Sequence, residues 1–246
     1  MNLPLKLGKA PLVEAVFDVR FTALFSASSI LPGMLFSKLD APRSVDRLPI
    51  ANLPEQMRSN DPNLMYAPFV KIGWDAFTIL ISDRSVALAC TIPYPGWPTF
   101  KRGILKVIEI IGTANVVQSI DRFSLKYVNV FPAELGEIGS IANLDVRIGP
   151  YSAEGHNVQL RAEIQHGELI RVLTIASSAK STFADGTSRS GPLLDIDIIA
   201  VIERTPFTKF FDNLSDRVEL VHTEAKATFF TCVKPEIMKK LEPFYA

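Results

Sequence analysis

The chain has 246 residues, 48% of them hydrophobic and 21% charged, and its 26 basic residues are balanced by 26 acidic ones. A chain of this length and composition forms one large or two small globular domains with a sizeable core, without help from metals or disulfides. Zero net charge argues against a protein that binds nucleic acid through a general electrostatic attraction, although a local basic patch is compatible with zero net charge.

The N-terminal sequence MNLPLKLGKAP lacks the apolar core of a signal peptide, and no apolar run approaches the roughly 18 residues that span a bilayer. We therefore expect a cytoplasmic protein that does not associate with a membrane. Cys90 and Cys232 lie far apart in apolar surroundings and are interpreted as small buried residues rather than as a disulfide.

The first element is the segment Ala10–Phe21, APLVEAVFDVRF. Its odd positions from Val13 onward are apolar, whereas Glu14, Asp18 and Arg20 occupy even positions. This period of two predicts a half-buried strand. Its charges either belong to a site or simply face water.

The rest of the first half is predicted to contain two helices and several short strands. A helix is expected over Ser28–Leu39 with Ser28 or Ser29 as its cap, followed by a long irregular connection from Asp40 to Pro68 that contains five prolines. A second helix starts at Pro98 and stops near Gly112. The predicted strands, of which the first three form an antiparallel meander, are Phe69–Gly73, Phe77–Ile81, Val86–Ile92 and Asp121–Phe131.

The second half carries more strands and the longest helix. A hairpin is expected to turn at His166–Gly167, and the polar segment Ser177–Pro192 is expected to be a mobile loop. Thr205 and Pro206 start a long helix with an apolar stripe, and a final turn follows at Pro235–Leu241. The predicted strands are Asn143–Gly149, Asn157–Gln165, Glu168–Ala176 and Leu193–Ile202.

These elements predict an α+β fold, an extended and mostly antiparallel sheet with helices packed on one face. We expect a single domain over residues 1–246, with a subdivision into 1–135 and 140–246 as the alternative. Each half ends in a long helix, which leaves open a distant duplication, although no repeat is visible at the level of residues.

Motifs of catalysis and metal binding are absent from the sequence. It contains no GxSxG, HExxH, CxxC, Walker-type or GxGxxG pattern, and its three histidines are not spaced as a metal set. We therefore predict no catalytic residue, no metal and no cofactor.

Carboxylates form the most suggestive pattern. Glu14 and Asp18 share one side of the first strand, and Asp195 and Asp197 share one side of a late strand. If the two strands are neighbours, these groups could act as acid and base or hold a divalent cation. The simpler interpretation is the solvent-facing side of a sheet. A site would also need a cation nearby, such as Arg122 or Lys126, because like charges side by side are unfavourable.

Two other features are candidate binding residues. A turn at His166–Gly167 places Arg171 opposite Ala162 on an otherwise apolar face, as a core ion pair, a ligand anchor or, in our preferred interpretation, an edge residue with its charge in water. Trp97, near Lys101 and Arg102, could stack on bases, but packing at the edge of the core explains it more simply.

Several segments together resemble a sporadically distributed, functionally uncharacterised family of prokaryotic proteins of about this length. The family's motifs are an opening Pro-x-x-Glu-Ala strand, a Tyr-x-x-Trp element, an Arg-x-x-x-Arg-Tyr-x-Asn strand and a late Leu-Leu-Asp-x-Asp. Lys126 replaces the second arginine, which keeps the charge but weakens a bidentate role. The matching residues are Pro11, Glu14, Ala15, Tyr94, Trp97, Arg122, Tyr127, Asn129, Pro132, Asp195 and Asp197.

The resemblance implies a single module and brings no activity with it, and its patchy distribution suggests mobile or defence-linked genes. Our leading hypothesis is a non-catalytic protein that binds a protein partner or its own copies, as a component of a bacterial conflict or defence locus. One alternative is an enzyme or ligand-binding protein that uses carboxylates, with Mg²⁺, on phosphate-bearing substrates. The other is an RNA or single-strand binder. For Glu14 we expect an ion pair with Arg122, Lys126 or Arg171.

Overall fold

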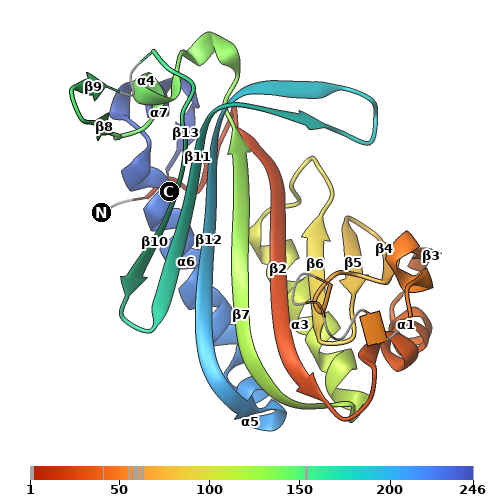
Figure 1. Ribbon diagram of the computed structural model, residues 1–246. Coiled ribbons are helices and arrows are strands. Elements are labelled where there is room, and N and C mark those ends of the chain that lie inside the picture. The colour runs from red at the N-terminus through yellow and green to blue at the C-terminus, as the bar shows by residue number, and fades with distance from the viewer. Residues whose placement is uncertain are drawn as a thin grey trace. The chain divides into compact units, whose positions relative to one another are not determined.

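A computed structural model describes residues 3–40, 42–54, 56–57, 61, 64–152 and 155–245. Its main sheet is built from β2 (Leu12–Ala23), β3 (Pro42–Arg47), β4 (Val70–Trp74), β5 (Phe77–Ile81), β6 (Ser85–Cys90), β7 (Val117–Val130), β10 (Gln159–His166), β11 (Leu169–Thr182) and β12 (Ser188–Pro206). These nine strands form one antiparallel sheet in the order β10-β11-β12-β7-β2-β6-β5-β4-β3 (Figure 1). The predicted α+β class is confirmed.

Shorter elements complete the fold. Two small sheets pair β1 (Lys6–Leu7) with β13 (Pro243–Phe244) and β8 (Arg147–Ile148) with β9 (Tyr151–Ser152). The helices are α1 (Ala27–Lys38), α3 (Trp97–Thr113), α4 (Ile138–Ile141), α5 (Phe207–Asp212), α6 (Leu214–Cys232) and α7 (Pro235–Lys240), with 3₁₀ turns η1 (Pro49–Asn52) and η2 (Ala133–Leu135). None of the helices in the described ranges combines the length and apolarity needed to cross a membrane.

The chain forms two compact units. Unit 1 comprises Met1–Ala15, Lys126–Ile198 and Val221–Ala246, and unit 2 comprises Val16–Leu125 and Ile199–Leu220. The strands β2, β7 and β12 and the helix α6 each contribute residues to both units. Each unit therefore draws on both halves of the sequence, and the division does not follow the predicted subdivision into 1–135 and 140–246.

Unit 2 contains the predicted meander and its covering helices. In β2 the odd positions from Val13 to Phe21 are buried, as the alternation predicts. The α3 helix packs closely on β5 and β6, because a Cβ at Gly103 would lie 3.0 Å from the Phe77 ring and 3.3 Å from Leu88. The Phe77 and Phe100 rings stack at 6.1 Å between centroids.

Unit 1 contains the part of α6 from Val221 onward, together with parts of the main sheet. Val221 and Ala225 of α6 are buried, and Phe229 stacks on Phe131 at 6.4 Å. A helix begins at Phe207, one residue after the predicted Pro206, but it is not continuous as predicted, because Asn213 interrupts it and separates α5 from α6.

The hairpin β10–β11 differs from its predicted register. Its turn is Gly167–Glu168, so that His166 faces Leu169 and Ile164, rather than Ala162, faces Arg171. Gly167 has φ +59°, which suits a two-residue turn at either of its central positions. A shift of two residues along one strand keeps every side chain on its predicted face.

Three segments predicted as loops or strands are corrected. Ser177–Pro192 is not a loop, because β11 continues to Thr182 and β12 starts at Ser188, forming a β-arm (Figure 1). Asp40–Pro68 contains β3 and η1, while residues 41, 55, 58–60, 62 and 63 of it lie outside the described residues. The strand expected over Asn143–Gly149 shortens to β8. The polar composition of the β-arm hides its strand character.

Gly191, at the base of the β-arm, is expected to tolerate no side chain. A Cβ at this position would lie 2.0 Å from the Phe131 carbonyl oxygen, and its φ is +149°. We expect Gly191→Ala to lower the free energy of unfolding by about 3 kcal/mol in urea denaturation, because strain and overlap add. Gly186→Ala is the control, since Gly186 has φ +83° but open space, so only about 1–2 kcal/mol is expected. Equal losses would contradict the steric argument.

Candidate functional site

An ion pair joins two neighbouring strands on one face of the sheet in unit 1. Lys126 of β7 places Nζ 3.2 Å from Oδ2 of Asp195 in β12. Strand alternation places Asp197 on the same side of β12 as Asp195. The carboxylate pattern singles out Asp195, and the resemblance singles out both Asp195 and the position of Lys126. The fold brings these two residues together.

The Asp195 carboxyl on this face has a raised pKa. Its side chain is only 18% exposed, and Oδ1 is buried with no hydrogen-bond partner among the described residues. Burial is the main factor that raises the pKa of Asp195; the charges of Asp197 and Glu14 raise it further, and Lys126 lowers it. Two other carboxylates and one lysine thus act on the Asp195 carboxyl.

A small apolar cluster borders the ion pair. Leu193 and Val128 lie two residues from Asp195 and Lys126 along their strands, a distance of roughly 7 Å. The buried and partly buried members of the cluster are Val13, Val128, Val130, Ala179, Phe183 and Leu193. Ala179 and Phe183 belong to the β-arm and its turn, so the β-arm supplies an apolar border to the carboxylates.

Glu14 does not form the ion pair that we expected. Among the described residues it has no ion-pair partner within 4.0 Å, because Lys126 pairs with Asp195 and Arg171 pairs with a residue of α6. Its side chain is exposed. Glu14 therefore acts on this face through its charge, as a neighbour of Asp195.

Asp18 and Arg122 belong to unit 2. Asp18 pairs with Arg20 at 3.5 Å, and the Arg20 guanidinium lies 4.0 Å from the centre of the Tyr66 ring. Arg122 is a half-buried residue of β7. The four predicted carboxylates thus separate into Glu14, Asp195 and Asp197 of unit 1 and Asp18 of unit 2.

On the helix side of the sheet in unit 1, Arg171 is tied to α6. Its Nε donates to Glu224 at 2.5 Å, and Nη2 contacts both Glu224 and His166 Nδ1, the latter at 2.7 Å. The Glu224 side chain is 16% exposed and that of Arg171 is 27% exposed. Of the three interpretations of Arg171, the ion pair is the one observed, and the preferred one, a charge held in water at the edge, is not.

Tyr127 and Asn129 of β7 also form contacts within unit 1. The Tyr127 hydroxyl lies 3.0 Å from His222 Nδ1 of α6, and Asn129 donates from Nδ2 to the Leu194 carbonyl at 3.3 Å. Asn129 is 4% exposed, so this hydrogen bond satisfies a buried amide. Both residues are explained by packing within unit 1.

The two contacts of α6 lie on opposite sides of its buried stripe. At 3.6 residues per turn, His222 follows Val221 on one flank and Glu224 precedes Ala225 on the other. Their partners lie on β7 and β11, which are separated by β12 and therefore stand roughly 10 Å apart, about one helix diameter. The sequence places His222 beside the stripe, but only the fold shows that Glu224 and Tyr127 complete this pair of contacts.

Trp97 in unit 2 has a local partner. Its indole N–H donates to Glu219 at 3.1 Å, and Lys101 Nζ lies 2.7 Å from the same carboxylate. The ring also meets Phe100 edge-on at 6.2 Å. These contacts match the expected packing of Trp97 at the edge of the core. They also engage the Trp97 indole, which would have stacked on a base, and the Lys101 ammonium, which would have attracted a phosphate group.

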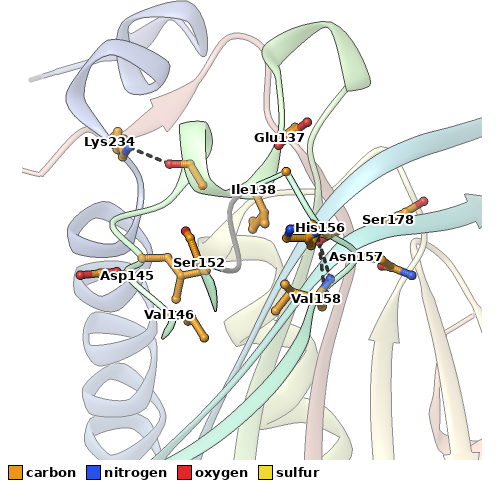
Figure 2. Close-up of a pocket in the computed structure, with 14 residues that line it drawn as sticks. Glu137, Ile138, Asp145, Val146, Ser152, His156, Asn157, Val158, Ser178 and Lys234 are labelled. Carbon is orange, nitrogen blue, oxygen red and sulfur yellow. Dashed lines mark hydrogen bonds between the residues drawn. The ribbon is translucent and has the colours of Figure 1, made fainter. Parts of the chain in front are cut away.

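Unit 1 contains a cavity of about 480 Å³ that sequence analysis did not find (Figure 2). Lys234 donates to the Gly139 carbonyl at 2.7 Å, and the Ser177 hydroxyl donates to the His156 carbonyl at 3.1 Å while accepting from the Val158 N–H at 2.9 Å. The walls of the cavity come from short segments that are distant in sequence and meet only in the fold. No local sequence signal therefore marks them. None of the predicted site residues lines it.

Within the described residues, no three His, Cys, Asp or Glu side chains are grouped closely enough to hold a metal ion. Comparison with models of known protein families gives no match, and comparison with curated protein sequences gives none either. The family resemblance therefore stays a prediction, and the function is argued from the geometry alone.

The contact between Arg171 and Glu224 is expected to stabilise unit 1 measurably. We expect a double-mutant cycle of Arg171→Met and Glu224→Gln to give a coupling energy of about 1–3 kcal/mol in urea denaturation, because both side chains are largely buried. The cycle of Lys9→Met and Glu242→Gln is the matched control, since that pair is 69% and 51% exposed, and about 0–1 kcal/mol is expected. Equal coupling in both cycles would show that α6 does not depend on this pair.

Asp195 is expected to make the protein less stable as pH rises. A carboxyl whose pKa is raised by folding binds its proton more tightly in the folded state, so its contribution to stability is lost as pH rises from its ordinary value of about 4 through the raised value. We therefore expect the stability of Asp195→Asn, relative to the parent chain, to increase between about pH 4 and pH 7.

Asp185→Asn gives the opposite control. Hydrogen bonds from the Thr187 hydroxyl and N–H lower the pKa of Asp185, so its contribution is present at neutral pH and lost as pH falls through that lowered pKa. Relative to the parent chain, this variant is expected to be less stable at pH 7 and to converge with it in acid. Urea midpoints across pH measure both variants, and the same slope for both would contradict the assignment.

Proposed function

We propose that the chain is a non-catalytic binding protein whose partner presents a lysine or arginine side chain to the carboxylates around Asp195. The observation that carries the proposal is the Asp195 side chain, whose buried Oδ1 has no hydrogen-bond partner among the described residues while Oδ2 holds Lys126. A buried acceptor without a donor is costly, and a donor from a partner removes that cost.

Charge and shape support a cation with an aliphatic stem. Asp197 and Glu14 place like charges near Asp195, so a positive charge added beside Asp195 is attracted to it. The bordering apolar cluster, which includes Leu193 and Phe183, offers a surface for methylene groups. Lysine and arginine combine these two properties in one side chain, which favours a protein partner.

The same charge balance weighs against the two alternatives. Phosphate groups of a nucleic acid or of a phosphate-bearing substrate would be repelled by the carboxylates of Asp195, Asp197 and Glu14. Membership of a bacterial conflict or defence locus rests on the sequence resemblance alone.

The proposal is tested by peptide selection followed by direct binding. The full chain is immobilised and used to select from a random peptide display library, and we expect the selected peptides to be enriched in arginine or lysine. Fluorescence anisotropy then compares one enriched peptide on the parent chain, Asp195→Asn and Glu134→Gln. We expect Asp195→Asn to weaken binding about tenfold or more, as loss of a charged hydrogen bond does.

Glu134→Gln is the matched control because Glu134 is an exposed carboxylate of unit 1 in η2, and binding to this variant is expected to be unchanged. Binding to the parent chain is also expected to weaken when acid protonates Asp195. Selected peptides without cationic residues, or equal binding to Asp195→Asn, would refute the proposal.

A further inference from the structure

The outer strand β10 presents free main-chain groups along its edge. In the described residues its only sheet neighbour is β11. Ser177 N–H donates to the Val158 carbonyl at 2.9 Å, and the register pairs His166 with Leu169 next to a two-residue turn. Both pairs are hydrogen-bonded ones, so even-numbered residues of this strand point their main-chain groups at β11.

The odd-numbered residues of β10 therefore point their N–H and C=O groups away from the sheet. These residues are Gln159, Arg161, Glu163 and Gln165, and all four are exposed. A free edge of this kind is a template for another strand, and proteins usually protect it with prolines, bulges or lysines. The opposite edge strand β3 begins with Pro42 and has an irregular register next to it. β10 has none of these features.

The sequence of β10 is complementary to itself when reversed. In the segment QLRAEIQ, Gln159–Gln165, an antiparallel copy centred on Ala162 sets Arg161 opposite Glu163 and Glu163 opposite Arg161. On the other face Leu160 meets Ile164, whose side chain is 43% exposed. Opposite charges and apolar pairs directly across a ladder both stabilise it.

The backbone agrees with this centre. A two-fold axis at Ala162 makes the Ala162 pair a non-hydrogen-bonded one and makes the Arg161–Glu163 pairs hydrogen-bonded ones. Those pairs use the main-chain groups of odd-numbered residues, which are the ones that the free edge offers. A register shifted by one residue would match outward groups with inward ones. A register shifted by two residues would set Arg161 or Glu163 opposite its own copy.

We propose that a second copy of this chain pairs antiparallel with β10 across a two-fold axis at Ala162, joining the sheets of the two copies edge to edge. The occupant is another copy because the complementarity is between the strand and itself, as a two-fold interface requires. This dimer involves none of the residues of the Asp195 face, so its test is separate from that of the proposed function.

Charge reversal tests the pairing. Sedimentation equilibrium of the full chain over a hundredfold concentration range is expected to give a dimer of twice 27.2 kDa. Arg161→Glu and Glu163→Arg each set like charges opposite one another, and each is expected to weaken dimerisation about tenfold or more. An equimolar mixture of the two variants restores opposite charges, and so does the double variant R161E/E163R, and both are expected to dimerise.

Two further variants separate the pairing from folding. Glu163→Pro removes an outward N–H that β11 does not use, so we expect loss of the dimer with an unchanged circular dichroism spectrum. Arg147→Glu reverses an exposed charge on β8 and is expected to leave the dimer intact. A parent chain that stays monomeric overturns the proposal. So does a dimer indifferent to the single reversals, or a loss that neither the mixture nor the double variant restores.

Discussion

The register of β7 against β12 sets Lys126 beside Asp195 in unit 1, and much of the unit follows from that register. Side chains alternate along a strand, so Tyr127 and Asn129 must point away from Lys126. The Tyr127 hydroxyl lies within hydrogen-bond distance of His222 in α6, and Asn129 donates a hydrogen bond to the Leu194 carbonyl of β12. One register therefore gives a helix-bearing face and a charged face, and a slip of one residue would exchange them.

Periodicity predicts the elements whose pattern is local. The alternation of β2, the meander of β4, β5 and β6, and α3 with its proline start all follow from residues adjacent in sequence. The β-arm does not, because its polar strands are stabilised by pairing with each other and by packing of Ala179 and Phe183 on distant valines. The turn at Gly167 was misplaced because glycine suits both central positions, and only cross-strand packing chooses between them.

The candidate site was predictable as a set of residues but not as a set of contacts. The sequence singles out Lys126, Asp195 and Arg171 as charges in unusual places. Their partners depend on pairings across long sequence separations, such as the 53 residues between Arg171 and Glu224. The expected ion pair of Glu14 does not form, since Lys126 pairs with Asp195 and Arg171 pairs with Glu224.

The zero net charge of the chain conceals two different local balances. Around Asp195, the like charges of Asp197 and Glu14 act on a carboxylate whose burial raises the cost of leaving an acceptor without a donor. Along β10, Arg161 and Glu163 balance within one strand, so that no charge is in excess, yet the order of the charges makes the strand complementary to its own reverse. An excess of one sign selects a partner of opposite charge, whereas an ordered balance selects a copy of itself.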